Sequence, residues 1–346
     1  MTSPVHSVAQ PDPVQIMFAL LNGHLVEQAL HVVAVLGIAD RLAGGPLTAA
    51  ELAADIGVNA PALYRLLRTL ASIGVFVRSA DDHFGLTPLG DTLRHDSPNS
   101  LRDRAVFYGS PEMWPVWGNL LHSVRTGRSA CEHRHGMPFY QFLIENPNVG
   151  TPFNRYMSNT SAQHNAAILD AYDFSRIATL VDIGGGHGGT LAAILGASPG
   201  LHGVLFDLPE VVEKASHLDA PDIAARSRRE GGDMEQGVPA GADAYLLKWV
   251  LMDRPDDRAV RLLRHCRTAM TAGGRVLVVE IGMPDDDQPS LGRVMDLQMM
   301  LLFGGGRIRT ETEFQALFAE AGLAITAVHS TRSPNVIIEG RAIVPE

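Results

Sequence analysis

A glycine-rich turn between an apolar strand and a helix constrains this chain more than any other feature of its sequence. The run from 180 to 191 reads LVDIGGGHGGTL, with Gly184, Gly185 and Gly186 directly after the apolar residues. Glycine lets the backbone approach a ligand closely, and a helix start leaves N–H groups free to bind it. The next apolar stretch ends in Asp207, whose carboxylate, about 20 residues past the glycines, suits the hydroxyls of a ribose. The pattern predicts a nucleotide-type cofactor site.

After residue 178 the chain alternates between short apolar strands and helices. Strands are expected at 180–183, 204–206, 244–247 and 276–280, with a closing hairpin at 324–329 and 335–341. Such alternation predicts a parallel sheet flanked by helices, with ligands bound at the carboxyl ends of the strands. The glycines match the dinucleotide pattern G-x-G-x-x-G only if Gly184, Gly186 and Gly189 are selected, so the glycine pattern alone leaves the cofactor open.

The first hundred residues have a different pattern. Thr48 and Glu51 have the spacing of a capping box before a helix that Gly57 ends. Leucines at helical spacing follow between 60 and 73, and residues 75–77 and 84–87 read as two paired strands. This order is typical of a winged helix-turn-helix. From about 100 to 170 the chain again reads as helical, with bulky aromatic residues.

Composition narrows the classes of protein. With 346 residues, 46% of them apolar, one large or two medium domains are expected. A net charge of −10 argues against a nucleic-acid partner, which usually needs a basic surface. No apolar run reaches the ~18 residues needed to span a membrane, and the N-terminus lacks a signal-peptide pattern. The distant Cys131 and Cys266 indicate a reducing compartment, so we expect a cytoplasmic protein without a membrane partner.

Four further motifs follow the glycine run in order: FDLP at 206–209, GGDM at 231–234, LKWV at 247–250 and MDRPDD at 252–257. Together they resemble the small-molecule O-methyltransferases that use S-adenosylmethionine (SAM), a group with plant caffeate and isoflavone enzymes and bacterial natural-product enzymes. The resemblance covers nearly the whole chain. It implies a Rossmann-like SAM-binding domain at 171–346, a helical connector at 101–170 that contributes to the acceptor pocket, and a mainly α-helical winged-helix dimerisation domain at 1–100. A homodimer is therefore expected.

The resemblance also implies which residues bind SAM. Gly184 and Gly186 would line its methionine portion, Asp207 would accept hydrogen bonds from the ribose, and Asp233 and Met234 would hold the adenine. Lys248 stands where the family has a lysine that contacts SAM. The expected cofactor-binding residues are Gly184, Gly186, Asp207, Leu208, Gly232, Asp233, Met234 and Lys248.

The chain departs from the family where the catalytic base is expected. The plant enzymes carry K-W-x-x-H-D-W, and here Met252 takes the histidine position and Arg254 the last tryptophan position. Of the two glutamates that orient the histidine, the first matches Glu280 and the second matches Ile308. Methionine cannot accept a proton, so we expect catalysis mainly by positioning, which can contribute roughly 7–11 kcal/mol. An acidic acceptor, such as a phenol beside a carbonyl, would react most easily.

Three residues are candidates for replacing the base. Asp253 follows Met252 directly, Glu280 keeps its place at the end of a strand, and His133 lies in the helical segment that resembles the roof of the acceptor pocket. His133 and His135 would point apart on a helix, and the chain has no metal-binding spacing of histidines, so no metal is expected.

Methionines and aromatic residues favour a flat aromatic or polycyclic small molecule as the acceptor. The expected acceptor-binding residues are Trp114, Phe139, Met157, Met252, Asp296, Met300 and Phe303. Two other functions stay open at this point. The first is an enzyme on the same scaffold that does not transfer methyl, such as a hydroxylase, decarboxylase or cyclase. The second is a DNA-binding regulator, which the winged helix permits and the acidic composition disfavours.

Overall fold

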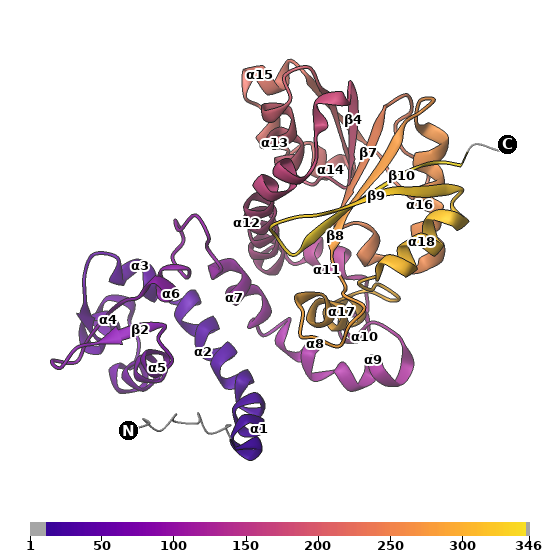
Figure 1. The fold of residues 1–346 in the computed structure, drawn as a ribbon. Coiled ribbons are helices and arrows are strands. Elements are labelled where there is room, and N and C mark those ends of the chain that lie inside the picture. Colours follow the sequence, from indigo (N-terminus) through magenta and orange to yellow (C-terminus); the bar gives the residue numbers. More distant parts are fainter. Residues whose placement is uncertain (1–11, 344–346) are drawn as a thin grey trace, which may run out of the picture. The chain divides into compact units, whose positions relative to one another are not determined.

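The structure, a computed structural model, describes residues 12–343 and divides into two compact units, with the division between Trp114 and Pro115 (Figure 1). The helices of the first unit are α1 (Pro13–Leu21), α2 (Gly23–Val35), α3 (Ile38–Leu42), α4 (Ala49–Ile56), α5 (Ala60–Ser72), α6 (Pro88–Asp91) and α7 (Arg102–Tyr108). Its strands are β1 (Leu47–Thr48), β2 (Phe76–Arg78) and β3 (His83–Leu86). Helix α8 (Trp114–Gly118) spans the division. The three-part division at 100 and 170 stays a prediction.

The first unit agrees with the winged-helix pattern. The capping box at Thr48 and Glu51 is present at the start of α4, and Gly57 ends that helix with a φ of +70°. Strands β2 and β3 pair antiparallel, and β1 pairs with the other side of β3. Leucines of α4 and α5 pack against this small sheet, which gives the unit its own core around Leu52, Leu67 and Phe84.

Helices α1 and α2 present apolar side chains that the described structure leaves uncovered. Val14, Phe18, Leu20 and Leu21 are each about two-thirds or more exposed. The segment Pro13–Val35 is also long and apolar enough to cross a membrane, by length and composition only. The expectation that no segment reaches that length is therefore wrong for these residues. The segment was not expected because His24, Glu27 and Gln28 interrupt its run of apolar residues. These three polar residues lie inside α2, which continues past them.

The second unit contains the predicted alternation of strands and helices. Its helices are α9 (Leu120–Thr126), α10 (Ala130–His135), α11 (Phe139–Glu145), α12 (Pro147–Ala171), α13 (Gly189–Ala197), α14 (Pro209–Val212), α15 (Pro221–Ala224), α16 (Asp256–Ala269), α17 (Leu291–Leu302) and α18 (Glu311–Glu320). Short 3₁₀ turns are η1 (Phe174–Arg176), η2 (Ser216–Leu218) and η3 (Leu251–Asp253). Its strands are β4 (Thr179–Ile183), β5 (His202–Asp207), β6 (Ser227–Gly231), β7 (Ala244–Lys248), β8 (Arg275–Ile281), β9 (Leu323–Ser330) and β10 (Asn335–Ala342).

The strands form one mixed sheet in the order β6-β5-β4-β7-β8-β10-β9. Strands β4 to β8 run parallel, and β10 enters antiparallel between β8 and β9. The chain order reverses at β4, which pairs with β5 on one side and β7 on the other. In open α/β sheets ligands bind at such a point, beyond the carboxyl ends of the strands. The predicted Rossmann-like sheet is confirmed, and β6 is a strand that the hydrophobic pattern did not predict.

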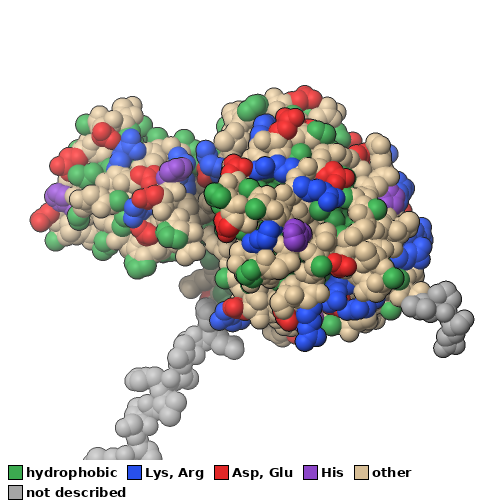
Figure 2. All heavy atoms as spheres, turned by 90° about the horizontal axis from the view of Figure 1, so that it is seen from above, with side chains coloured by type: hydrophobic (Ala, Val, Ile, Leu, Met, Phe, Trp, Pro, Cys, Tyr) green, Lys and Arg blue, Asp and Glu red, His purple; other side chains and the backbone are tan. Residues whose placement is uncertain are grey.

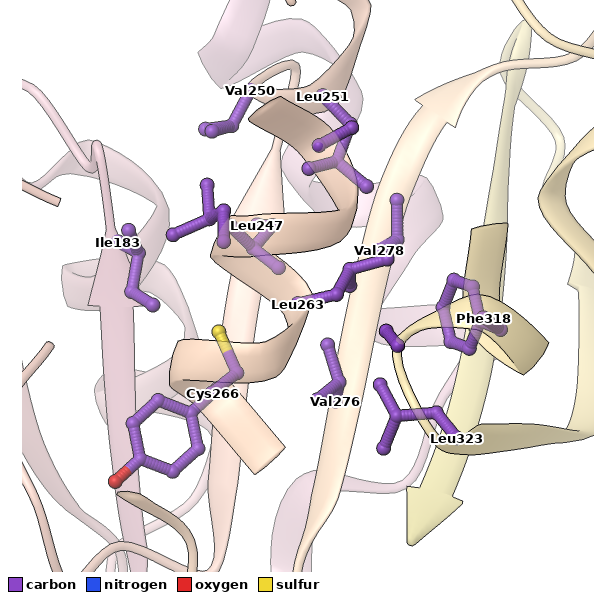
Figure 3. Close-up of a cluster of buried hydrophobic side chains, with 14 of the residues drawn as sticks. Ile183, Leu247, Val250, Leu251, Leu263, Cys266, Val276, Val278, Phe318 and Leu323 are labelled. Atoms are coloured by element: carbon purple, nitrogen blue, oxygen red, sulfur yellow. The ribbon is translucent and has the colours of Figure 1, made fainter. Parts of the chain in front are cut away.

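Two apolar layers hold helices to opposite faces of this sheet. Alternate residues of one strand enter different layers: Leu180 packs with α12 and α13, whereas Val181 and Ile183 pack with α16 and α18. Figure 3 shows the second layer, in which Leu263 and Cys266 of α16 meet Val276 and Val278 of β8. Burial on both faces makes the central strands almost wholly apolar, as parallel sheets require. The carboxyl edge of the sheet is therefore held rigidly.

Charged side chains are mixed on the surface. Figure 2 shows Lys and Arg interspersed with Asp and Glu over the face in view, without a broad area of one sign. A nucleic-acid-binding surface is normally a basic patch or stripe. The face in view offers none.

Candidate functional site: the carboxyl edge of the sheet

The glycine turn after β4 leaves a space that a ligand can enter. Gly184, Gly186 and Gly188 have φ values of +67°, +59° and +81°, a region that other residues rarely adopt. A Cβ on Gly184 would lie 3.0 Å from Val250 Cγ2, whereas a Cβ on Gly186 would meet no atom within 4 Å. Helix α13 begins directly after the turn, at Gly189. Gly186 therefore borders open space beside a helix start.

Asp207 ends β5 and holds this turn in place. Its Oδ2 accepts a hydrogen bond from Gly186 N at 2.8 Å, and its Oδ1 accepts one from Leu208 N at 2.8 Å. Burial raises the pKa of Asp207 and outweighs the opposing effect of these two N–H groups. A carboxylate offers about four lone-pair positions, so two remain for further donors such as the hydroxyls of a ribose.

The loop after β6 approaches the same turn. Gly232 N donates to Asp207 O at 2.9 Å, and a Cβ on Gly232 would lie 2.6 Å from the Phe206 ring. Met234 Cε lies 3.3 Å from the position of a Cβ on Gly184, so the thioether covers the glycine turn. Asp233 is exposed and accepts from Glu235 N at 2.9 Å, the contact of a turn residue. The structure therefore brings Met234 to the turn, while Leu208 and Asp233 face solvent beside it.

Lys248, at the end of β7, is enclosed. Its Nζ donates to Ser161 Oγ at 2.5 Å, Thr190 Oγ1 at 3.1 Å and Asn165 Oδ1 at 3.2 Å, which joins β7 to α12 and α13. Burial lowers the pKa of Lys248 to about 7, against the opposing effect of the Asp182 charge. The contact of Lys248 with SAM stays a prediction, because in this structure its donors reach protein oxygens.

Asp182 of β4 carries an unused acceptor next to this network. Its Oδ2 is buried and has no hydrogen-bond partner. Burial raises the pKa of Asp182 to about 7, although the Lys248 charge lowers it. The unpartnered oxygen, the open position at Gly186 and the spare acceptors of Asp207 fit a ligand that carries both hydroxyl groups and N–H donors. SAM, with its ribose and its ammonium group, is such a ligand.

Met252 lies in the η3 turn, and the side chain of Glu280 accepts hydrogen bonds from the backbone of that turn. Oε1 of Glu280 accepts from Leu251 N at 3.0 Å and from Met252 N at 3.2 Å. Burial, with the charge of Asp253 as a second cause, raises the pKa of Glu280 to about 8. Met252 itself packs with Ile281, Met299 and Ile308. The first family glutamate is thus a backbone acceptor here, and the second is replaced by an apolar contact.

Asp253 is the acidic group of the turn with a side-chain partner. Its Oδ2 accepts from the hydroxyl of Tyr140 at 2.5 Å, a contact between η3 and α11. Burial raises the pKa of Asp253 to about 6, although Tyr140 and Arg254 both oppose the shift. Burial and the charge of Asp253 raise the pKa of Tyr140 well above its ordinary value. No sequence pattern indicates this pair, because 113 residues separate its members.

Aromatic rings gather near the η3 turn. Phe139 is 5.2 Å from Phe153 and 5.4 Å from Phe303 between ring centroids, and Tyr140 is 5.5 Å from Phe303. Phe303 also packs against the Met252 cluster, which contains Met299 and not the expected Met300. The structure therefore joins Phe139, Phe303 and Met252 through ring and side-chain contacts.

Other expected residues lie differently. Asp296 Oδ1 accepts from Ile308 N at 2.8 Å, so this carboxylate holds the backbone at the second glutamate position. His133 is exposed, and its ring stacks on His122 of α9 with centroids 3.9 Å apart, so that contact turns it toward α9. Met157 and Met300 are half-buried. Trp114 lies at the division of the two units. Over residues 12–343 no three acidic, histidine or cysteine side chains gather as metal ligands would.

Two arginines of the site were missed by sequence reasoning. Arg309 is wholly buried and donates to Leu251 O at 2.8 Å and Arg254 O at 2.7 Å. Arg254 lies 3.0 Å from Met234 Sδ through Nη2. For Arg254, its place at the tryptophan position of the motif was the only indication in the sequence. For Arg309 there was none, because the order of residues does not show which distant carbonyls an arginine reaches.

Comparisons with known proteins match both units. A family model of the O-methyltransferase domain covers residues 117–324, and one of the O-methyltransferase dimerisation domain covers residues 18–96. The phenazine O-methyltransferase of Lysobacter antibioticus is 41% identical over 95% of this chain and 96% of its own length. The structure of the mitomycin 7-O-methyltransferase superposes with a TM-score of 0.89 at 38% identity, over 95% of this chain and 98% of the other.

Two further similar proteins bear on ligand and reaction. An O-methyltransferase of neocarzinostatin biosynthesis was solved in complex with SAM and 2-hydroxy-5-methyl naphthoic acid; it is 33% identical, with a TM-score of 0.79, over 99% of this chain and 100% of the other. The aclacinomycin 10-hydroxylase of Streptomyces purpurascens is 35% identical over 90% of this chain and 85% of its own length. The hydroxylase is a more distant relative of this chain than the phenazine O-methyltransferase.

Proposed function

This chain belongs to the O-methyltransferase family, and on that premise we propose that it transfers the methyl group of SAM to a hydroxyl of an aromatic or polycyclic small molecule. The observation that carries the proposal is the carboxyl edge of the sheet. There the glycine turn, Asp207 and Met234 surround an open position, and Phe139 and Phe303 lie near Met252. A nitrogen acceptor is the less favoured form of the same reaction.

The site divides the binding of SAM among four strand ends. Gly184 and Gly186 after β4 let the ligand approach the backbone, Asp207 after β5 offers free lone pairs to the ribose, and Met234 after β6 covers the turn. Lys248 and its hydroxyl partners close the remaining side. When bound, SAM supplies an electrophilic methyl group on a sulfonium sulfur. The aromatic side chains exclude water and orient the flat acceptor.

Positioning supplies most of the rate in this proposal, because Met252 cannot take a proton. Among the three candidates for a base, His133 stacks on His122 and Glu280 accepts two backbone N–H groups. With a pKa of about 8, Glu280 is mostly neutral at pH 7. Asp253, with a pKa of about 6, is mostly ionised there. Asp253 would accept the proton of the acceptor hydroxyl as the C–O bond forms and the methyl group leaves the sulfonium sulfur, which would give S-adenosylhomocysteine.

The direct test is incubation with SAM that carries a radiolabelled methyl group, together with a panel of phenols and hydroxynaphthoates. The proposal expects label in at least one phenol and equimolar formation of S-adenosylhomocysteine. Acceptors with a carbonyl beside the hydroxyl should react fastest, because they lose their proton most easily. Bound SAM with no labelled product from the whole panel would contradict methyl transfer.

A non-methylating reaction on the same scaffold is the second candidate function. The observation that favours it is the absent base, seen together with the similarity to a hydroxylase. A hydroxylase, decarboxylase or cyclase of this kind would keep the SAM-binding residues. It would give a product without the methyl label. Liquid chromatography with mass spectrometry of the same incubations detects it, by a changed mass after hydroxylation or decarboxylation and by a changed retention time after cyclisation.

Activity should fall as the pH falls through about 6, and Asp253→Asn should abolish that dependence. The carboxylate must be ionised to accept a proton, and its raised pKa places the loss between roughly pH 5 and 7. Because positioning remains, we expect Asp253→Asn to lower kcat by about 100-fold at pH 7.5, the low end of the usual contribution of a general base. The measurement is kcat against pH with the best acceptor of the panel.

A matched control removes a nearby carboxylate that faces solvent. Asp257 belongs to the same motif and its side chain is 72% exposed, so Asp257→Asn should keep the wild-type profile. An unchanged acid limb in Asp253→Asn would show that Asp253 does not receive the proton and that positioning acts alone.

We propose a homodimer in the cytoplasm as the working state. The exposed apolar residues from Phe18 through α2 lie within the segment 18–96 that the dimerisation-domain model matches, and a second copy would cover them. A mass near twice 37.2 kDa by light scattering is expected. A monomer at micromolar concentration would contradict this, and sedimentation with lipid vesicles would favour the membrane instead.

A further inference from the structure

Arg254 connects three segments of the site. Its side chain is only 15% exposed, although it stands where the resembling motif has a tryptophan. Nη1 donates to Val250 O at 2.5 Å, which ties the guanidinium to the turn after β7. Nε donates to Glu235 Oε1 at 3.2 Å, and Nη2 lies 3.0 Å from Met234 Sδ. One side chain therefore joins the exit of β7 to the loop that follows β6.

Met234 transmits this connection to the glycine turn. Its methyl group lies 3.3 Å from the position of a Cβ on Gly184, and Val250 Cγ2 lies 3.0 Å from the same position. Methionine has three rotatable side-chain bonds and adapts to irregular gaps, so by itself it is a poorly fixed surface. The contact with Arg254 and the packing against Gly184 restrict the thioether from both sides.

Glu235 is the acidic partner, and two arginines share it. Arg254 is the inner one, while Arg258 Nη2 lies 2.9 Å from Glu235 Oε1 with 48% of its side chain exposed. Burial alone would raise the pKa of Glu235, but the two arginines outweigh it and the pKa is lowered. A partly buried ion pair in which one member is removed leaves the other uncompensated, whereas an exposed pair contributes little. The inner arginine should therefore matter far more than the outer one.

We propose that Arg254 is a positioning residue for the adenosyl end of the cofactor: it clamps loop 233–235 to the turn after β7 and holds Met234 over the glycine turn. The inference rests on the proposed function, which places the adenine against Met234. If the thioether is already fixed in the position that it takes in the complex, less side-chain conformational entropy is lost on binding. Arg254 acts through Met234 and Glu235 and leaves the reacting atoms to other residues.

The test is binding of S-adenosylhomocysteine by isothermal titration calorimetry to the full-length protein and to Arg254→Gln and Arg258→Gln. We expect Arg254→Gln to weaken binding about tenfold or more, and Arg258→Gln to stay within about twofold of wild type. With the labelled SAM assay, the KM for SAM should rise in Arg254→Gln while kcat changes by less than about twofold. Arg254→Lys should restore little of the affinity, because an ammonium lacks the planar fork that reaches all three partners.

Glu235→Gln separates clamping from general destabilisation. It removes the charge of the pair but keeps the Arg254 side chain and an amide oxygen that can still accept from it. Binding should weaken in the same direction, while the ligand-free melting temperature stays near that of wild type because Arg254 keeps a hydrogen-bond partner. Binding by folded Arg254→Gln within about twofold of wild type, or equal weakening in both arginine variants, would overturn the clamp. Wild-type protein that binds no S-adenosylhomocysteine would overturn the proposed function itself, so the two failures are distinguishable.

Discussion

Replacing Asp207 by alanine is expected to weaken the binding of S-adenosylhomocysteine by at least about 100-fold, because hydrogen bonds to a charged group contribute about 1.5–3 kcal/mol each. The substitution removes the acceptors that the ribose would use. It also frees the N–H groups of Gly186 and Leu208, which Asp207 now binds at 2.8 Å each. The turn then loses two of its restraints, while the hydrogen bonds from Gly184 N to Phe206 O and from Gly188 N to Gly185 O remain. Calorimetry measures the dissociation constant directly.

Glu210→Gln is the matched control for Asp207→Ala. Glu210 is an exposed carboxylate of α14 whose charge acts on Asp207 without touching the glycine turn. We expect the affinity of the Glu210→Gln variant for S-adenosylhomocysteine to stay within about threefold of wild type. Asp207→Asn should be almost as damaging as alanine, since its NH₂ group would face one of the two N–H donors. Affinity near wild type in Asp207→Ala would remove the carboxylate from the binding site.

Arg309→Met is expected to lower the free energy of unfolding by about 3 kcal/mol, the scale of several lost buried hydrogen bonds to a charge. The Arg309 side chain is 0% exposed, and it is the largest side chain buried to this degree. It donates to Leu251 O and Arg254 O at 2.8 and 2.7 Å and to Asp256 Oδ1 at 2.8 Å. Methionine fills most of the volume, takes the side-chain donor away from Arg254 O, and leaves Leu251 O with the backbone N–H of Arg254 at 3.1 Å. Urea unfolding monitored by circular dichroism gives the difference.

Arg307→Gln provides the comparison for Arg309→Met. Arg307 pairs with the same Asp256 at 2.9 Å, but 41% of its side chain is exposed. Exposed pairs contribute about 0–1 kcal/mol, so this variant should unfold close to wild type. If both variants lost the same free energy of unfolding, the contribution of Arg309 to stability would come from its pairing with Asp256 and not from its hydrogen bonds to the buried carbonyls. We expect Arg309→Met also to lose activity when still folded, because the turn with Met252 and Asp253 would lose the donors that Arg309 gives to Leu251 O and Arg254 O.

The order of elements in the second unit was predictable, because buried parallel strands leave long apolar runs between glycines and helices. Strands expected at 180–183 and 244–247 appear as β4 and β7 with one extra residue each. Strand β6 was missed for a physical reason. Its sequence is SRREG, and an edge strand pairs through its backbone while its side chains face water.

The site was predictable only where its residues follow strands directly. Gly186 and Asp207 lie at strand ends, so one sheet edge collects them. Contacts between distant elements were beyond the pattern: Tyr140 reaches Asp253 across 113 residues, and Asp296 holds Ile308. Motifs fix which backbone turns meet at the edge, whereas the partner of a buried arginine or tyrosine depends on packing that no local pattern records.

The charged residues of β6, which kept the hydrophobic pattern from predicting this strand, also affect how the protein associates with other chains. One side of β6 pairs with β5, and its other side is an open edge of the sheet. Arg228 and Arg229 are exposed there, and Glu230 is partly exposed beside them. An unprotected edge is a template on which another unfolded chain can add a strand, and charged side chains on the edge strand make that addition unfavourable. These three side chains therefore oppose aggregation. Replacing them by neutral residues should lower the solubility of the protein during expression more than its catalytic activity.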